Sequence, residues 1–327
     1  MKCLCCGKEI KDGTVAEKGW HRKCIRSFFG TESLPLLDVS KEELEELAKK
    51  TTERGFTVPG VQKKLSLHLS REGMSRLTLV DYPTGYILKP QAPGYTALPE
   101  AENLVMHMAE AAGIACVPHA LIRTSGDGGE FAYITKRIDR VFPSGKNSKM
   151  KKLAMEDFCQ LGMRLTEDKY RGSYEKSAGI VKRHSVRMGL DLADLYYRIL
   201  FFFITGNADM HLKNFSLIET ESGNRQYVLS PAYDMLPVNI VLPQDKEELA
   251  LTLNGKKMNL RRNDFLKFAA GCGIDKKAAI NMMNKILTKK EQFLKMCMES
   301  YMQEEMKEAL AGLISDRAER LHSEGPV

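Results

Sequence analysis

The pattern of apolar residues changes near residue 150, and this change constrains the fold of the 327-residue chain more than any other feature of its sequence. Before that point, short apolar or alternating runs are separated by glycine-containing turn sequences, a pattern that predicts strands. We expect these strands at residues 65–69, 76–80, 86–89 and 131–136. One helix, predicted over Leu98–Ala112 and ended by Gly113, interrupts them.

Beyond residue 150, apolar residues recur at helical spacing. We expect helices over residues 153–165, 174–184, 192–205, 262–272, 276–284 and 289–321. One β-like patch between two helical stretches predicts a hairpin of residues 215–218 and 226–229. The sequence therefore predicts an α+β fold, in which a small mixed β lobe precedes a larger α-helical lobe. This bilobal layout is typical of protein kinases.

Composition excludes few classes of protein. No apolar run reaches the ~18 residues needed to span a bilayer. The start Met1–Lys2–Cys3 lacks an apolar signal region, so we expect a cytoplasmic protein without a membrane partner. The net charge is +7, but acidic and basic residues are interspersed, which indicates a solvated surface more than a nucleic-acid-binding one.

The cysteines are unevenly distributed, because four of the eight fall within the first 24 residues. In a cytosolic protein such crowding favours metal binding over disulfides. Cys3 and Cys6 form one spaced pair and His21 and Cys24 form a second, which predicts a structural Zn²⁺ site with four protein ligands. Cys5 is an alternative to Cys3 or Cys6, and an unstructured terminus with reduced thiols is the competing interpretation.

Four parts of the chain follow from these patterns. Residues 1–32 form a zinc-knuckle-like segment, and residues 33–54 form a linker, in which Ser40–Lys50 carries a capping box and predicts a short helix. Residues 55–140 form the small lobe, and residues 141–327 form the helical lobe.

The most informative segment follows the very hydrophobic stretch 199–204. Asp209 and Asn214 have the D-x₄-N spacing of a kinase catalytic loop, in which the aspartate accepts the substrate hydroxyl proton and the asparagine holds a metal ion. Asp234, twenty residues on, stands where a kinase places the carboxylate that binds Mg²⁺. The spacing alone is weak evidence, since Asp and Asn are common in turns, but the helix before it and the hairpin after it favour phosphoryl transfer. His211 and Lys213 are expected to support the loop or the phosphates.

A phosphate-binding lysine is the second requirement of such a site. Lys89 ends a predicted strand, and Glu102 on the predicted helix is its best partner, with Glu100 as the alternative. There is no GxGxxG motif. The segment that contains Gly60, Val61, Gln62 and either Lys63 or Lys64 is the candidate phosphate loop instead.

Seven segments together resemble the HipA family of serine/threonine kinases, in the same order from about residue 55 to residue 320. They are GVQKKLS (60–66), ILKP (87–90), LPEAEN (98–103), ITKRIDR (134–140), MEDFCQL (155–161), NADMHLKNFSL (207–217) and SPAYDM (230–235). The short form is similar to the HipT branch, in which a separate small protein takes the place of an amino-terminal subdomain.

The resemblance implies an ATP- and Mg²⁺-dependent kinase that acts as the toxin of a toxin–antitoxin system. The expected partners are a HipB-like DNA-binding antitoxin, through which alone DNA is contacted, a small HipS-like protein, and a protein substrate such as an aminoacyl-tRNA synthetase. By matching motifs, Asp209 is the base, Asn214 and Asp234 ligate Mg²⁺, and Lys89 contacts phosphate. The remaining matched positions are Lys136 and Ile138 at an adenine-binding hinge, Asp139 near the ribose, and His211 and Tyr233 lining the site.

Two features depart from the family pattern. Thr57 is the only hydroxyl residue near the phosphate-loop motif where relatives carry autophosphorylated serines, so it is the autophosphorylation candidate. The cysteine-rich amino terminus is absent from the better-known members. Two other functions stay open at this point: a small-molecule kinase, and a non-catalytic co-repressor that acts with a DNA-binding partner.

Overall fold

The structure is a computed structural model, and it describes residues 1–11, 16–38, 64–70, 75–78, 84–124, 129–142 and 150–322. The expected linker helix of residues 40–50, the candidate loop residues Gly60, Val61 and Gln62, and Thr57 lie outside these ranges. The chain forms two compact units. The sheet unit comprises Met1–Asn103 and Val117–Met150, and the helical unit comprises Leu104–Cys116 and Lys151–Val327.

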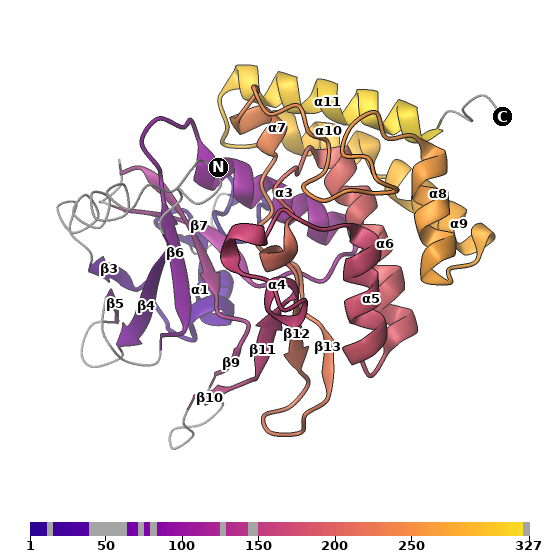
Figure 1. The fold of residues 1–327 in the computed structure, drawn as a ribbon. Helices are drawn as coiled ribbons and strands as arrows, with labels where there is room; N and C mark the ends of the chain where they lie inside the picture. The colour runs from indigo at the N-terminus through magenta and orange to yellow at the C-terminus, as the bar shows by residue number, and fades with distance from the viewer. Residues whose placement is uncertain are drawn as a thin grey trace. The chain divides into compact units, whose positions relative to one another are not determined.

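A six-stranded sheet forms the centre of the sheet unit, with the strand order β3-β5-β4-β6-β8-β7 (Figure 1). Its strands are β3 (Leu36–Asp38), β4 (Leu65–Ser70), β5 (Arg76–Thr78), β6 (Tyr86–Pro90), β7 (His119–Arg123) and β8 (Phe131–Lys136). Neighbouring strands are antiparallel except β3 and β5, which are parallel. The short strand β9 (Arg140–Val141) follows.

The register of β6 against β8 determines which side chains share a face of the sheet. Lys89 lies opposite Tyr133, and Leu88 lies opposite Ile134. Because successive side chains of a strand point to opposite faces, Lys89 and Tyr133 share one face and Leu88 and Ile134 share the other. The Lys89 ammonium lies 5.2 Å from the centre of the Tyr133 ring, which agrees with this assignment.

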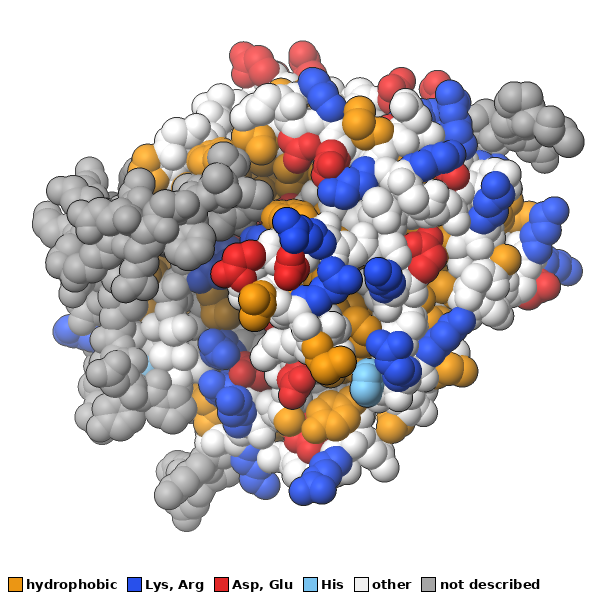
Figure 2. Space-filling model, viewed as in Figure 1, with side chains coloured by type: hydrophobic (Ala, Val, Ile, Leu, Met, Phe, Trp, Pro, Cys, Tyr) orange, Lys and Arg blue, Asp and Glu red, His pale blue; other side chains and the backbone are white. Residues whose placement is uncertain are grey.

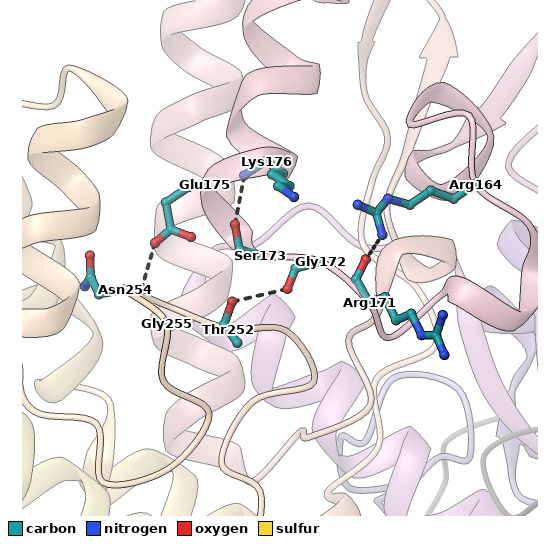
Figure 3. A pocket seen from close by; sticks show the side chains of 9 residues that line it. All are labelled: Arg164, Arg171, Gly172, Ser173, Glu175, Lys176, Thr252, Asn254 and Gly255. Carbon is teal, nitrogen blue, oxygen red and sulfur yellow. Dashed lines mark hydrogen bonds between the residues drawn. The ribbon is translucent and has the colours of Figure 1, made fainter.

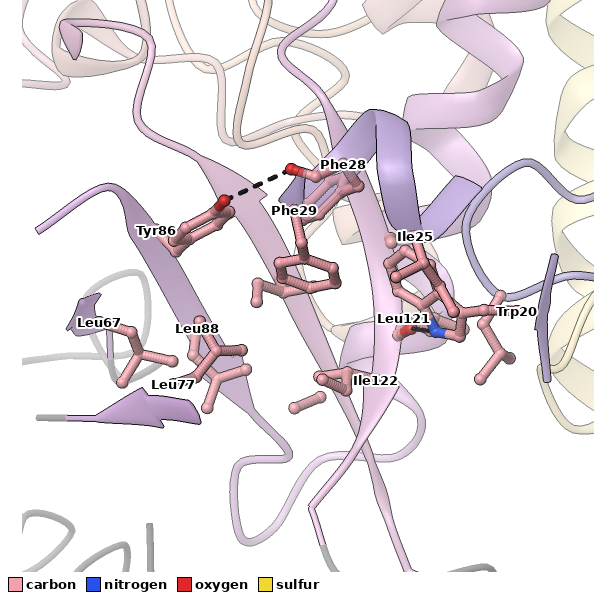
Figure 4. Packing of buried hydrophobic residues seen from close by; sticks show 14 of the residues in the cluster. Trp20, Ile25, Phe28, Phe29, Leu67, Leu77, Tyr86, Leu88, Leu121 and Ile122 are labelled. Carbon is pink, nitrogen blue, oxygen red and sulfur yellow. Dashed lines mark hydrogen bonds between the residues drawn. The ribbon is translucent and has the colours of Figure 1, made fainter. Parts of the chain in front are cut away.

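The amino-terminal segment covers the second face. It consists of the hairpin β1 (Ala16–Glu17) and β2 (Trp20–His21), followed by α1 (Arg22–Phe29). Gly30 ends α1 in the left-handed conformation, with φ of 69°. The segment's aromatic residues and the apolar residues of β4, β6, β7 and β8 form one continuous core (Figure 4).

In the helical unit, a three-stranded antiparallel sheet and a set of helices surround the long helix α6 (Met188–Thr205). Eleven successive residues of α6, from Leu195 to Thr205, are buried, which agrees with its all-round hydrophobic sequence. The strands are β11 (Met155–Asp157), β12 (Ser216–Glu219) and β13 (Tyr227–Leu229), and β10 (Lys151–Lys152) precedes them.

The helices of this unit begin with the larger part of α3 (Leu98–Ala112), whose first residues belong to the sheet unit. The others are α4 (Phe158–Leu161), η2 (Thr166–Asp168), α5 (Tyr174–His184), η3 (Leu212–Asn214), α7 (Val238–Val241), α8 (Arg262–Cys272), α9 (Lys276–Leu287), α10 (Lys290–Met298) and α11 (Glu304–His322). Within the described part of the chain, none of the helices is long and apolar enough to cross a membrane.

The α+β prediction is confirmed, but two of the expected helices are not single continuous helices. The helix expected over residues 153–165 is replaced by β11 and the short α4, because Met155–Asp157 pairs with β12 and Asp157 then caps α4 through a capping box. The helix expected over 289–321 is divided into α10 and α11 by residues 299–303, among which Met302 is buried. Neither tertiary contact is visible in local periodicity.

Candidate functional site

A buried ion pair joins β6 to α3 in the sheet unit. Lys89 Nζ lies 2.5 Å from Glu102 Oε1, and the two side chains are only 4% and 1% exposed. Burial raises the pKa of the carboxyl group of Glu100, the alternative partner. Burying two charges in this way costs solvation and is seldom a route to stability, so such a pair suggests a functional use.

The turn between β6 and α3 is organised by Gln91, a residue that the sequence analysis missed. Its side-chain amide donates to the carbonyl oxygen of Tyr95, at 2.5 Å, and its oxygen accepts from the backbone N–H of Leu98, at 3.1 Å. The second bond satisfies one of the free N–H groups at the start of α3. Gln91 therefore connects the strand that carries Lys89 to the helix that carries Glu102.

Of the other nucleotide-binding residues expected in the sheet unit, Lys64 and Lys136 lie in the described part of the chain. Lys64 is exposed at the start of β4. The ammonium of Lys136 donates to the carbonyl oxygen of Ser27 at 3.3 Å and lies 5.6 Å from the Phe28 ring. Burial lowers the pKa of Lys136. The Lys136 side chain therefore lies on the face of the sheet that does not carry Lys89.

The carboxylate of Asp139 forms ion pairs with two arginines. Arg137 forms two bonds to it at 3.0 Å, and Arg140 lies 2.5 Å from Oδ2. Burial opposes ionisation of this carboxyl group, but the two guanidinium groups outweigh it and hold the pKa of Asp139 below its usual value. Asp139 thus orders the chain after β8, while the neighbouring Ile138 is half-buried.

In the helical unit, the loop after α6 holds Asp209 and Asn214 together. Gly206 ends α6 with φ of 71°, a left-handed conformation that reverses the chain. The carbonyl oxygen of Asp209 then accepts from the side-chain amide of Asn214, at 2.9 Å, and from the backbone of His211, at 2.8 Å. These two bonds fix the positions of residues 209 and 214 relative to each other.

The carboxylate of Asp209 has a partner that the sequence analysis missed. The hydroxyl of Tyr170 donates to Asp209 Oδ1, and His211 Nε2 lies 3.9 Å from the same oxygen. The rings of Tyr170 and His211 meet edge to face, with centroids 4.9 Å apart. Burial and the charge of Asp209 raise the pKa of Tyr170, so the phenol stays protonated and acts as a donor.

Asp234 lies at the end of a stretch that is tied to the rest of the helical unit. The backbone N–H of Ala232 donates to the carbonyl oxygen of Ala115, at 2.7 Å. The Tyr233 hydroxyl lies 2.6 Å from Ser216 Oγ, and burial raises the pKa of this tyrosine. Asp234 itself has φ of 61°, a left-handed conformation that is uncommon for a residue with a side chain. Such strain is often found at functional sites.

Lys213 connects the loop that carries Asp209 and Asn214 to α4. Its ammonium lies 3.0 Å from Asp157 Oδ2, and Asp157 caps α4. The backbone N–H of Phe158 donates to the carbonyl oxygen of Phe215, at 2.9 Å, and the two rings stack with centroids 5.5 Å apart. The ion pair with Asp157 is the contact through which Lys213 would support the loop.

A cavity of about 580 Å³ adjoins the segment that carries Tyr170 (Figure 3). The cavity is lined by the basic residues Arg164, Arg171 and Lys176 and by the acidic residue Glu175. The carboxylate of Glu175 accepts a hydrogen bond from the backbone N–H of Asn254, at 2.9 Å. The excess of positive charge suits an anionic group. Elsewhere on the face shown in Figure 2, basic and acidic side chains of the described residues are interspersed, as the composition predicts.

Four metal-binding side chains of the amino-terminal segment lie together in the sheet unit. One ligand atom from each of Cys3, Cys6, His21 and Cys24 lies within 4.8 Å of the others. This is the set expected from the sequence, and Cys5 is not part of it. The cluster belongs to the segment that packs on the face of the sheet opposite Lys89.

Comparison with known proteins identifies the family. Residues 56–293 match the model of the HipA-like C-terminal domain, and this match covers more than half of the chain. The chain belongs to the HipA-like C-terminal domain family. The HipA resemblance predicted from the seven motifs is thereby confirmed.

Relatives of similar sequence carry kinase names. A Haemophilus influenzae protein named "Putative kinase" is 25% identical over 295 residues, which are 82% of this chain and 82% of that protein. Two Sinorhizobium fredii proteins, "Putative kinase Y4mE" and "Putative kinase Y4dM", are 27% and 28% identical over 64% and 69% of this chain. The matched regions are 48% and 56% of those two proteins, so the chain spans about half their length.

Two solved structures share the fold. HipA of Shewanella oneidensis, solved with HipB and its operator DNA, has a TM-score of 0.67 and 19% identity, over 81% of this chain and 65% of that one. The proinflammatory kinase CtkA of Helicobacter pylori has a TM-score of 0.52 and 14% identity, over 79% of this chain and 96% of that one. At these identities the likeness is one of fold.

Proposed function

We propose that this HipA-family chain is an ATP- and Mg²⁺-dependent protein serine/threonine kinase. The observation that carries the proposal is the tethered pair Asp209 and Asn214, with the Asn214 amide bonded to the Asp209 carbonyl oxygen at 2.9 Å. This bond fixes the two residues relative to each other, as their roles in a kinase catalytic loop require. The buried Lys89–Glu102 pair supports the same function, because phosphoryl transfer needs a lysine held in place by a glutamate.

The donor set fits Mg²⁺. The amide nitrogen of Asn214 is used in the bond to Asp209, which leaves its amide oxygen as the group able to ligate a cation. Asp234 offers carboxylate oxygens, and hard Mg²⁺ prefers such ligands and keeps several waters. Bound Mg²⁺ would offset the negative charge of the transferred phosphoryl group.

The roles of the protein residues follow from their contacts. With Tyr170 bonded to one carboxylate oxygen, Asp209 would orient the substrate hydroxyl and accept its proton on the other. Lys89 would neutralise the nucleotide phosphates, with Glu102 as its positioning residue. Such catalysis rests on positioning and charge, because phosphoryl transfer asks little covalent chemistry of the protein.

The biological setting is proposed by analogy with relatives. HipA of Shewanella oneidensis was solved with HipB and operator DNA. We therefore propose that this chain acts as a toxin neutralised by a HipB-like DNA-binding antitoxin, with a small HipS-like protein as a further partner. An aminoacyl-tRNA synthetase is the proposed substrate class, and Thr57 is the proposed site of autophosphorylation. The basic cavity beside Tyr170 would hold an acidic part of the protein substrate.

Labelling with radioactive ATP and Mg²⁺ in a cell lysate tests the proposal. The wild type is expected to label a discrete lysate protein, and Asp209→Asn is expected to label none. Asp316→Asn, which removes an exposed carboxylate on α11, is the matched control and keeps full activity. Absence of both labelling and ATP binding by calorimetry would contradict the kinase proposal and favour the non-catalytic co-repressor.

A further inference from the structure

We propose that Cys3, Cys6, His21 and Cys24 bind one structural Zn²⁺, and that this metal makes the amino-terminal segment an integral part of the sheet unit. On this proposal, removal of the metal disorders the packing behind strand β6 and so weakens the position of Lys89. The metal site itself is tested without catalysis, whereas its effect on Lys89 is read through nucleotide binding and rests on the proposed function.

The distances within the cluster match a tetrahedral zinc site. With Zn–S bonds of about 2.3 Å and Zn–N bonds of about 2.0 Å, a tetrahedral site separates its nitrogen and sulfur ligands by about 3.5 Å. The observed separations of His21 Nδ1 are 3.5 Å from Cys6 Sγ and 3.9 Å from Cys24 Sγ. These two separations are close to the tetrahedral value, and the ligand atoms of all four side chains lie within 4.8 Å of one another.

The backbone forms the two turns that such a site requires. After the first pair of ligands, Gly7 has φ of 64° and its N–H donates to the carbonyl oxygen of Cys3, at 2.9 Å. The second pair begins α1, where His21 is the N-cap and Cys24 lies in the first turn. The N–H of His21 also lies 3.4 Å from Cys3 Sγ, a contact that suits a thiolate.

The chemistry of the ligands selects zinc over the harder cations. Three thiols and one imidazole are soft or intermediate donors, which suit Zn²⁺ and not Mg²⁺ or Ca²⁺. Four protein ligands leave no open coordination position, so the site is structural and not catalytic. No disulfide forms among these cysteines, so the sulfurs remain available as ligands.

The segment has no core of its own and depends on the sheet. Trp20, Phe28 and Phe29 are 0%, 3% and 2% exposed, and they contact one another with ring centroids 4.8–5.5 Å apart. The Phe29 ring then lies 5.5 Å from that of Tyr86 on β6. About 30 residues cannot bury enough apolar surface to fold alone, so this segment needs both the sheet and a metal.

Hydrogen bonds join the segment to the edge strand β7. The indole of Trp20 donates to the carbonyl oxygen of Leu121, at 3.1 Å, and the N–H of Leu121 donates to the carbonyl oxygen of Leu4, at 2.9 Å. Leu4 lies between Cys3 and the remaining ligands in the sequence. The edge strand is thus bonded by Trp20, which Figure 4 shows beside Leu121, and by Leu4, and each of the two is next to a proposed ligand in the sequence.

The consequence for β6 follows from strand geometry. Leu88 lies in the core formed with Trp20 and the two phenylalanines, and the next residue along the strand, Lys89, points to the opposite face. Loss of the aromatic packing would remove the support behind the strand. The position of Lys89 relative to Glu102 therefore depends on a metal bound on the other side of the sheet.

The test uses the full-length chain, the Cys24→Ser variant, and Cys5→Ser as the matched control, because Cys5 lies between the ligands in sequence but outside the cluster. Elemental analysis is expected to find one zinc per chain in the wild type and in Cys5→Ser, and less than a tenth of that in Cys24→Ser. Exchange with Co²⁺ is expected to give the thiolate charge-transfer and d–d absorption bands of a tetrahedral Cys₃His site.

The structural role has a separate readout in Trp20, the single tryptophan of the chain. Treatment of the wild type with a chelator is expected to shift the Trp20 emission to longer wavelength and to weaken nucleotide binding at least tenfold, and Zn²⁺ is expected to reverse both. This measurement does not require the variant to fold. Absence of zinc together with absence of the Co²⁺ bands would overturn the site. Zinc binding with unchanged Trp20 emission after its removal would overturn the structural role.

Discussion

Replacement of Glu102 by glutamine is expected to destabilise the sheet unit by about 3–5 kcal/mol. Glu102 and Lys89 are 1% and 4% exposed and lie 2.5 Å apart, so loss of one partner leaves the other charge buried without its counter-charge. Lys89→Met has a similar expected cost, to which loss of the Tyr133 ring contact adds about 0.5–2 kcal/mol.

The double variant Lys89→Met, Glu102→Leu separates stability from function. Apolar residues of similar volume in place of a buried ion pair are often neutral or stabilising, so this variant is expected to unfold close to the wild type. Phosphotransfer is expected to be lost in the single variants and in the double variant alike. A stable but inactive double variant would indicate that the pair is kept for chemistry and not for folding.

Urea unfolding followed by Trp20 fluorescence is the assay, because Trp20 is buried in the same core as β6. The matched control is Glu32→Gln, which breaks the exposed Arg26–Glu32 pair. That pair has the same 2.5 Å separation, but its side chains are 59% and 79% exposed. It is expected to change the free energy of unfolding by less than about 1 kcal/mol. If the double variant is as unstable as the single variants, the reasoning about this ion pair is refuted.

Three further predictions follow from single contacts. Tyr170→Phe removes the donor to Asp209 and is expected to lower kcat about tenfold while KM for ATP stays unchanged, because a hydrogen bond to a charged group contributes about 1.5–3 kcal/mol. Steady-state kinetics measure both constants, and an unchanged kcat would contradict the prediction. Asp139→Asn removes a carboxyl group of lowered pKa, which stabilises the fold above its ordinary pKa of about 3.9 and loses that effect as pH falls through the lower folded value. The variant is therefore expected to be less stable at pH 7 and to show a flatter stability profile below about pH 4 in urea titrations. Lys176→Ala combined with Arg164→Ala is expected to raise KM for the labelled protein substrate about tenfold while KM for ATP stays the same, and equal rises in both would argue against substrate binding in the cavity.

The parts of the fold that could be predicted from sequence are those in which local pattern and tertiary environment agree. The helices Leu98–Ala112, Tyr174–His184 and Arg262–Cys272 have the expected bounds, because each carries a continuous apolar stripe that packs as its spacing requires. Strand β7 was missed, since its three apolar residues in succession lack alternation and its place in the sheet comes from pairing with β8. β11 was mistaken for helix for the same reason: long-range pairing outweighed local propensity.

The residues of the candidate site also fall into those that could be predicted from the sequence and those that could not. Asp209, Asn214, Asp234, Lys89 and Glu102 could be named because each has a fixed spacing or a place at the end of an element, and chemistry demands that residue type there. Their catalytic and metal-binding roles remain predictions.

Tyr170 and Gln91 could not be found, because their importance lies in what they touch. Tyr170 is 39 residues from Asp209, and Gln91 is seven residues from the helix start that it caps. Gln91 lies in the turn before the helix and Tyr170 lies far from Asp209 in the sequence, so only the folded chain brings these donors and acceptors together. A residue that positions a catalytic group can come from anywhere in the sequence, because no fixed spacing is required of it. In this protein the structure therefore adds more about the supporting contacts than about the reacting groups.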